Sequence, residues 1–534
     1  MQIHSQDVSC EDESRKARSW LALSTGFAIV SITCAAVALC VHVLTHYPFY
    51  DECLHVHYAW LVSIGDVPYR DFWCPYPVMG YYLTAPLLML LPESIWTFFA
   101  LRFFTLLMTV ALGVLFAWHG LRTAKNWKWA VVCFCAVITI PAMARFLAEY
   151  SVDHLACLAA LCAISLCFAP PTVGRVQVVA ALSCVSFLVT PKYPFTLALA
   201  GTGFFISACV GLSSWRARLI LAVRCMSMFL LAGLVAALGL WLAGVSLIDY
   251  MAIPFGLQSR YNLAVRNDIL LFALVRFLLC RPWCLALLCT AVLSWSWHTR
   301  SRLLALQLGP CGTLLGLCVT VAVVPQWYEQ YLWPVLIVLL LFVPYIAMTK
   351  MLHTRPRLQL VLLATGALIT IGHTWRATEN FKRTPLNTRG AAPPDLYVEW
   401  TEPALRYMRH LQSLLLLIPP EERVVAIWDH HPLFRRDLTY VTQDETPSKI
   451  FSLSSGDPRR ETFSTNAFLQ ALNEHAPAYI SPRHSQENMT YGWRDVLRAF
   501  MLCHTQQYYM MEFPHGPVFI RADIMFKYRQ SRID

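Results

Sequence analysis

Long apolar runs separated by short polar segments dominate residues 20–373 of the chain. Eleven of them approach the length of about 20 residues that a helix needs to cross a bilayer. They cover 20–44, 95–118, 129–144, 154–169, 176–190, 195–211, 219–243, 282–298, 304–324, 332–349 and 357–373. Two further segments, 78–91 and 268–281, fit interfacial or re-entrant helices. The pattern predicts a polytopic α-helical membrane protein with about eleven transmembrane helices.

Three regions follow from this pattern: a polar tail at 1–19, a membrane domain at 20–373 and a soluble region at 374–534. The soluble region opens with a polar, proline-containing linker at Thr384–Pro394. Alternating strand and helix patterns follow, and we expect a small C-terminal α/β domain. The expected elements are strands at Val424–Trp428, Pro477–Ile480 and Val518–Arg521, and a helix at Thr462–His475.

Composition agrees with the membrane assignment. The 534 residues are 57% hydrophobic and 14% charged, whereas a soluble domain has about 25% charged residues. The net charge of +10 comes mostly from loop Lys and Arg and not from a basic soluble domain, so nucleic acid is excluded as a partner. Most of the 19 cysteines lie in the spans, but Cys53 and Cys74 share a polar loop and could pair in an oxidising compartment. The first span lacks a clear cleavage site, so we interpret it as an uncleaved signal anchor.

Loop charges predict the orientation. The tail and alternate loops carry fifteen Lys and Arg, against five in the opposite short loops. The positive-inside rule predicts that the tail and the loops rich in Lys and Arg lie in the cytoplasm. An odd number of spans then places the C-terminal domain outside. After the tail, all ten acids of the membrane domain lie near the predicted outer side. This distribution favours an outward-facing polar chamber, although longer outer loops would also explain it.

The longest of these outer loops, 45–94, begins with the adjacent acids Asp51 and Glu52. Residues 51–64 suit a helix with both carboxylates in its first turn, where they complement the helix dipole. Asp51 and His55 share a face at i,i+4 spacing, and Gly65 ends the helix. Acids beside a membrane span are costly to place there, so the pair marks a candidate functional site.

The residues around this pair carry a family resemblance. Asp51-Glu52, the run Gly65 to Phe72 and the Pro- and Tyr-rich run Pro75 to Pro86 resemble the polyprenyl-phosphate-sugar-dependent glycosyltransferases of the GT-C fold. That family includes bacterial relatives of the dolichyl-phosphate-mannose protein mannosyltransferases and of the lipid A aminoarabinose transferase. The resemblance implies an inverting transfer of sugar from a polyprenyl-phosphate donor to a hydroxyl of a glycolipid, polysaccharide or protein. The expected location is the outer face of a bacterial cytoplasmic membrane.

The resemblance also implies catalytic roles for the two acids. An alcohol is a poor nucleophile, so a carboxylate should accept its proton, and Asp51 is the expected base with Glu52 as its catalytic neighbour. The leaving phosphate needs cationic partners and no acid. The expected phosphate-binding residues are Lys192, Arg260 and Arg266. Lys192 could instead be an interfacial cation whose charge reaches toward water.

Other polar residues of the outer loops are expected to bind substrate. They are His55, Tyr69, Arg70, Asp71, Glu149 and Asp153. A solvated loop is the simpler reading of the last two. The chain departs from the family at Trp73-Cys74-Pro75-Tyr76, where similar proteins often carry more polar residues, and recognition of the acceptor is therefore expected to differ. It also departs at Glu329-Gln330, where relatives often carry a His-Tyr-like pair, so the resemblance assigns no role to that loop.

No metal site is predicted from the sequence. A bound divalent ion is an alternative, because His55 and His57 lie near Asp51 and Glu52, and histidine and carboxylate ligands suit zinc. On a helix the two histidines diverge by about 200°, which argues against a shared ion. A transporter or lipid flippase is the alternative function, and a non-catalytic scaffold is a third. A transporter should place charges within its spans, and this chain has few there: Arg102 and Arg224 lie near predicted span ends.

Overall fold

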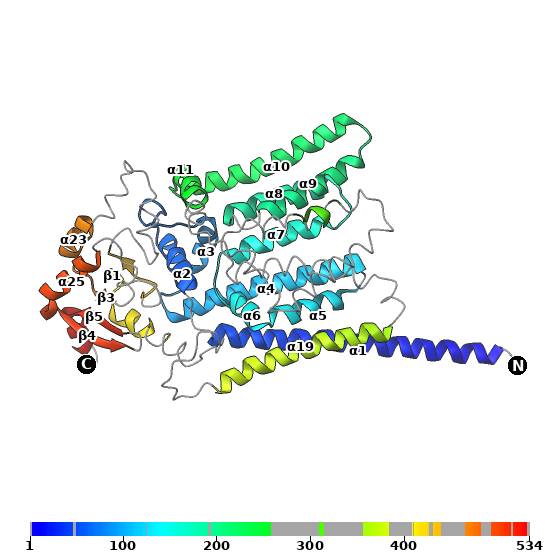
Figure 1. The fold of residues 1–534 in the computed structure, drawn as a ribbon, viewed down its shortest axis with the longest axis horizontal. Helices are drawn as coiled ribbons and strands as arrows, with labels where there is room; N and C mark the ends of the chain where they lie inside the picture. Colours follow the sequence, from blue (N-terminus) through cyan, green and yellow to red (C-terminus); the bar gives the residue numbers. More distant parts are fainter. Residues whose placement is uncertain are drawn as a thin grey trace, which may run out of the picture.

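The computed structural model consists of a helical bundle with a small mixed sheet at one end (Figure 1). The structure describes residues 3–45, 50–124, 126–190, 194–257, 308, 310–313, 315, 356–383, 408, 411–426, 431–438, 465–481, 493–513 and 516–530. Three predicted spans, 282–298, 332–349 and nearly all of 304–324, lie outside these residues, as do the segment 268–281 and the linker Thr384–Pro394.

The other eight predicted spans are helical. They correspond to α1 (Ile3–Thr45), α4 (Ile95–Ala124), α5 (Trp127–Ile138), α7 (Asp153–Cys167), α8 (Val173–Val189), α9 (Pro194–Val210), α10 (Trp215–Leu242) and α19 (Pro356–Arg383). Four of them, α1, α4, α10 and α19, are long and apolar enough to cross a membrane. The chain is thus an integral, multi-pass membrane protein.

The span predicted at 129–144 is not one continuous helix. α5 ends at Ile138, the backbone is extended at Ile140, and α6 (Pro141–Ala148) then begins. Proline lacks an N–H and disfavours the helical conformation of the residue before it, so Pro141 starts a new helix. The span prediction was wrong here because apolar composition alone does not reveal a break.

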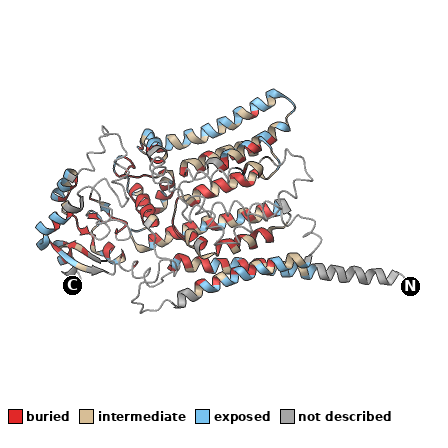
Figure 2. Ribbon diagram, in the orientation of Figure 1, coloured by how far each residue is buried: buried red, intermediate tan, exposed pale blue. Residues whose placement is uncertain are grey.

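α10 exposes a large apolar surface. Only 6% of its most hydrophobic window is buried inside the protein. Figure 2 shows buried residues concentrated in the helices between α10 and α19, and in α2. Because an exposed apolar helix is unstable in water, this surface requires a hydrocarbon environment.

Successive helices alternate in direction, so their connections fall at two ends of the bundle (Figure 1). The N-terminal part of α1 extends from one end. The C-terminal sheet lies at the other, together with α2 (Tyr50–Ser63), α3 (Met79–Met89) and α11 (Leu247–Met251), which the π-helical turn η1 (Ala252–Leu257) follows. The polar loop 45–94 and the C-terminal domain therefore share one end, and the compartment they face stays a prediction.

α2 and α3 confirm the helices expected at 51–64 and 78–91. α2 is followed by Gly65 at φ +93°, a conformation that glycine adopts without the Cβ clash of other residues. This turn directs the chain away from α2 and into the segment before α3.

The C-terminal domain contains a five-stranded sheet in the order β2-β1-β3-β5-β4. Its strands are β1 (Arg423–Val425), β2 (Arg436–Asp437), β3 (Tyr479–Ile480), β4 (Tyr508–Phe513) and β5 (Gly516–Arg521). β1 pairs in parallel with β2 and β3, whereas β5 is antiparallel to β3 and β4. The helices are α23 (Thr465–Glu474), α25 (Trp493–Cys503) and α26 (Ala522–Gln530), and the 3-10 turn η4 (Thr505–Gln507) precedes β4.

The sheet and α23 confirm the α/β prediction for this region, although the bounds differ: β5 begins two residues before the predicted strand and β3 contains only Tyr479–Ile480. The register places Val424 beside Tyr479 and Tyr479 beside Ile520, and all three side chains are fully buried. The sequence did not reveal β2, because two residues are too few to show an alternating pattern.

Candidate active site

α2 is buried on every side, and residues 52–62 are all buried. Three polar side chains, Glu52, His55 and His57, are buried with it. Buried polar groups need hydrogen-bond partners, and each of the three finds its partner in a different part of the protein. These partners explain why α2 takes this position at the end of the bundle.

Glu52 pairs with Arg102 of α4. The guanidinium Nε and Nη2 donate to Oε1 and Oε2 at 2.8 and 2.6 Å, and both side chains are fully buried. The Tyr150 amide donates to Oε1 at 2.9 Å, while Arg102 Nη1 donates to the Val43 carbonyl at 2.8 Å. Both Glu52 oxygens are therefore engaged, and the ion pair ties α2 to α1, α4 and the loop before α7.

Asp51 has different surroundings from its neighbour. It lies in the first turn of α2 and is partly exposed, whereas Glu52 is 1% exposed. Of the two adjacent carboxylates, only Asp51 is thus partly open to solvent at the end of the bundle. Its position in the first turn places it where the helix dipole stabilises a negative charge.

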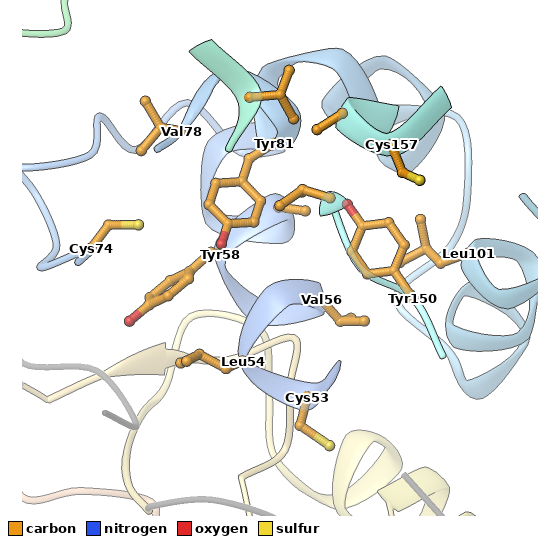
Figure 3. Close-up of a cluster of buried hydrophobic side chains, with 14 of the residues drawn as sticks. Cys53, Leu54, Val56, Tyr58, Cys74, Val78, Tyr81, Leu101, Tyr150 and Cys157 are labelled. Atoms are coloured by element: carbon orange, nitrogen blue, oxygen red, sulfur yellow. The ribbon is translucent and has the colours of Figure 1, made fainter. Parts of the chain in front are cut away.

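The segment 149–153, which contains Glu149 and Asp153, lies beside Glu52. The Tyr150 amide contacts Glu52, and the Tyr150 hydroxyl lies 2.7 Å from Thr84 Oγ1 of α3. Figure 3 shows Tyr150 and Tyr81 among the side chains packed around α2. Glu149 is buried and accepts from Arg145 Nε at 3.0 Å, and Asp153 is partly exposed in the first turn of α7. The fold thus brings the two predicted acidic segments, 51–52 and 149–153, to one place.

His55 lies against α3. Its Nδ1 is 2.7 Å from the Tyr81 hydroxyl, and its ring is 5.2 Å from that of Tyr76. Cys53 and Cys74 are both buried in the same region and neither is in a disulfide, so the pairing considered from the sequence does not form (Figure 3). His55 and Glu52 have separate partners, and the metal site considered for Asp51, Glu52, His55 and His57 is not assembled in this structure.

Tyr69, Arg70 and Asp71 form a tight turn after α2. Tyr69 has φ +66°, its amide donates to the Phe72 carbonyl at 2.9 Å and its hydroxyl donates to the Tyr76 carbonyl at 2.9 Å. Asp71 accepts from the Val67 amide at 2.7 Å and pairs with Arg70 at 2.7 Å. Its hydrogen bond with Arg70 lowers the pKa of Asp71. These residues hold the turn, and their predicted contact with substrate stays a prediction.

The predicted phosphate-binding residues Lys192, Arg260 and Arg266 lie outside the part of the chain that the structure describes, as does Glu329-Gln330. Sequence reasoning missed Arg102, which it placed near the end of a span. An arginine within an apolar segment needs a buried partner, and that requirement was the available signal.

An apolar cavity of about 420 Å³ lies between α8, α9 and α10. Its lining includes Val179, Phe187, Leu197 and Phe229, and its polar side chains are limited to the hydroxyls and thiol of Ser183, Thr202 and Cys225. The lining contains no charged side chain. A phosphate group would therefore find no cation in this cavity.

The C-terminal domain packs onto the end of α2. Arg435 Nη1 donates to Glu93 at 2.9 Å, and Trp60 of α2 donates to the same carboxylate at 3.0 Å. Arg436 and Asp66 form a more exposed ion pair at 2.8 Å. α2 is therefore enclosed between the membrane helices and the C-terminal domain, and the sequence had no means of revealing this enclosure.

No family model matches the chain, and no curated protein sequence does. Solved structures do match. ArnT from Cupriavidus metallidurans bound to undecaprenyl phosphate has a TM-score of 0.57 at 12% identity, covering 94% of this chain and 99% of its own. ArnT from the same organism in the apo state has a TM-score of 0.54 at the same identity and coverage. The chain therefore has the fold of ArnT, a GT-C polyprenyl-phosphate-sugar glycosyltransferase, which confirms the fold expected from residues 51–86.

Proposed function

We propose that this protein is a glycosyltransferase that moves a sugar from a polyprenyl phosphate to a hydroxyl group of an acceptor. The observation that carries the proposal is the ArnT fold over 94% of the chain, together with the bound undecaprenyl phosphate of one ArnT structure. The reaction takes place at the end of the bundle where α2 lies. The acceptor is a glycolipid, a polysaccharide or a protein on the outer face of the membrane.

Asp51 acts as the general base in this proposal. Its carboxylate accepts the proton of the acceptor hydroxyl while that oxygen attacks the anomeric carbon. The bond between this carbon and the phosphate oxygen breaks, the polyprenyl phosphate leaves, and the anomeric configuration inverts. The partial exposure of Asp51 supports this role because a base must reach a bound substrate.

Glu52 acts as a positioning residue. Both of its oxygens are held by Arg102 and the Tyr150 amide, and its side chain is fully buried, so it supports the base without contacting the acceptor. Arg102 also neutralises a negative charge directly beside the base. In this proposal only Asp51 of the two expected catalytic acids takes the proton, and Glu52 holds α2 in position.

The remaining outer residues bind substrate in this proposal. Asp153 and Glu149 bind hydroxyls of the sugar or the acceptor in this proposal, and the partial exposure of Asp153 near the Tyr150 contact supports its role. Lys192, Arg260 and Arg266 stay the candidates for the donor phosphate, since a leaving phosphate needs cationic partners. The proposed substrate site is also lined by His55 of α2 and by the turn that follows it, Tyr69, Arg70 and Asp71.

Purified protein incubated with radiolabelled polyprenyl-phosphate sugars and membrane acceptors tests the proposal. Asp51→Asn should lower the rate of sugar transfer by about 10²–10⁴-fold, because the variant keeps the shape but cannot take the proton. Asp66→Asn is the matched control, since Asp66 pairs with Arg436 away from the base. Transfer that survives unchanged in Asp51→Asn would remove Asp51 from the mechanism. Movement of a lipid or solute without covalent transfer would favour a transporter instead.

A further inference from the structure

His57 meets two residues of the C-terminal domain that are distant from it in sequence. Its Nε2 lies 2.9 Å from Asp437 Oδ2, and His431 Nε2 lies 3.1 Å from Asp437 Oδ1. The two imidazole rings are 4.3 Å apart between centroids. The candidate ligand atoms of all three residues lie within 4.8 Å of one another.

The cluster is closed to solvent. The side chains of His57 and His431 are fully buried, and that of Asp437 is 8% exposed. The ring of Trp60 stacks on His57 at 5.7 Å between centroids. Burying a carboxylate here requires nearby positive charge, because isolated buried charges are expensive.

The hydrogen bonds of His57 place two acceptor atoms against each other in its contact with Asp437. Its Nδ1 lies 2.6 Å from the Leu433 carbonyl, which can only accept, so Nδ1 must carry a proton. In a neutral ring Nε2 then holds a lone pair, and that lone pair faces the Asp437 carboxylate at 2.9 Å. Two acceptors at this distance need a positive species between them. The Asp437 carboxylate faces His57 with one oxygen and His431 with the other, so both of its oxygens meet an imidazole.

The backbone supports a built site. Leu433 adopts φ +24°, a left-handed conformation that costs energy for a side chain with a Cβ, and its carbonyl is the group that receives Nδ1. In metal sites, a histidine ligand commonly donates its other ring N–H to a backbone carbonyl or a carboxylate, which fixes the orientation of the ring. In addition, the buried Nδ1 of His431 has no hydrogen-bond partner among the residues that the structure describes.

We infer that His57, His431 and Asp437 bind one divalent transition-metal ion of the zinc class, which fastens the C-terminal domain to α2. Two imidazole nitrogens and one carboxylate oxygen are ligands that such ions prefer. Tetrahedral zinc places its ligand atoms about 3.3 Å apart, given bonds of about 2.0–2.1 Å, so the three groups need only small movements to enclose the ion. The site is distinct from Asp51 and lies on the same helix, six residues further along.

Metal analysis of the full-length protein tests this inference. The protein is purified through a tag without histidines, loaded with Zn²⁺, freed of excess metal and measured by inductively coupled plasma mass spectrometry. We expect about one ion per chain, and loss of most of it in His57→Gln, His431→Gln and Asp437→Asn. His55→Gln and His504→Gln are the matched controls and should keep the ion, because their rings bond to Tyr81 and to the Phe500 carbonyl.

A second measurement does not depend on the variants folding. A chelator such as EDTA should lower the thermal unfolding midpoint of the wild-type protein, because an ion bound only by the native state stabilises it. Restoring Zn²⁺ should restore the midpoint. A wild-type protein that holds no stoichiometric metal after loading and ignores the chelator would overturn the inference and leave a second proton on His57 as the positive species. Metal that persists undiminished in all three ligand variants would overturn it as well.

Discussion

Asp51 and Glu52 are adjacent in the chain but lie in different environments. Glu52 is fully buried against Arg102, whereas Asp51 is partly exposed at the start of α2. Successive helical residues point about 100° apart, so one faces the membrane helices while the other does not. At the scale of single residues, this difference separates a candidate base from a residue that supports it.

The Glu52–Arg102 pair leads to a prediction about stability. Glu52→Gln and Arg102→Met should each destabilise the protein by about 3–5 kcal/mol, because each leaves the other charge buried without a partner. The double variant Glu52→Gln/Arg102→Met should lose less than the sum of the two single losses. Thermal unfolding of the three variants in detergent measures these differences, and additive losses would show that the pair is not coupled.

At the scale of elements, α2 is held by three different neighbours. Glu52 connects it to α4, His55 to α3 and His57 to the C-terminal domain. Each contact comes from a different direction around the helix. α2 therefore functions as the element that joins the membrane helices to the soluble domain, in addition to carrying Asp51.

The packing of α19 on α5 gives a prediction at this scale. A Cβ built on Gly366 would lie 2.6 Å from Val132 Cγ1, so the two helices approach through this glycine. Gly366→Ala should destabilise the protein by about 1–3 kcal/mol through overpacking. Adding Val132→Ala removes the clashing methyl group and should recover part of the loss.

Gly372 provides the matched control for this helix. It lies further along α19, and a Cβ there would meet nothing within 4 Å. Gly372→Ala should therefore leave the thermal unfolding midpoint unchanged or raise it slightly, since alanine favours the helix. Equal destabilisation by both alanines would contradict the close approach at Gly366.

At the scale of the whole molecule, the C-terminal domain and α2 share one interface. Trp60 and Phe434 pack edge to face with ring centroids 6.3 Å apart, and Arg435 and Arg436 contact Glu93 and Asp66 on the membrane domain. Apolar residues from both domains belong to one continuous core cluster. The two domains are therefore expected to unfold together.

The two neighbouring arginines give a prediction for this interface. Arg435 is 3% exposed, donates to Glu93 and also satisfies the Ile418 and Leu415 carbonyls. Arg435→Met should destabilise the protein by about 2–4 kcal/mol and speed proteolysis of the C-terminal domain. The reason is that the Glu93 carboxylate and these two carbonyls lose their hydrogen-bond donor. Arg436→Met is the control, because its half-exposed ion pair with Asp66 is worth about 0–1 kcal/mol. Similar losses in both variants would contradict this account.

The sequence alone determined the class of the protein, the helix at 51–64 and the position of the acidic pair within it. It also placed Asp51, Asp153 and the C-terminal domain at the same end of the bundle. These features follow from hydropathy, charge and short-range spacing, which are local properties of a chain. They could be predicted because apolar segments must enter the membrane and glycine and proline must end helices.

Only the tertiary structure decided which polar groups meet. The partner of Glu52 lies 50 residues further along the chain, and Asp437 lies 380 residues from His57. Such pairs leave no periodic signal, because their spacing in sequence is unrelated to their distance in space. The burial of Glu52 and the His57, His431 and Asp437 cluster therefore emerge only when folding brings α2 between the bundle and the C-terminal sheet.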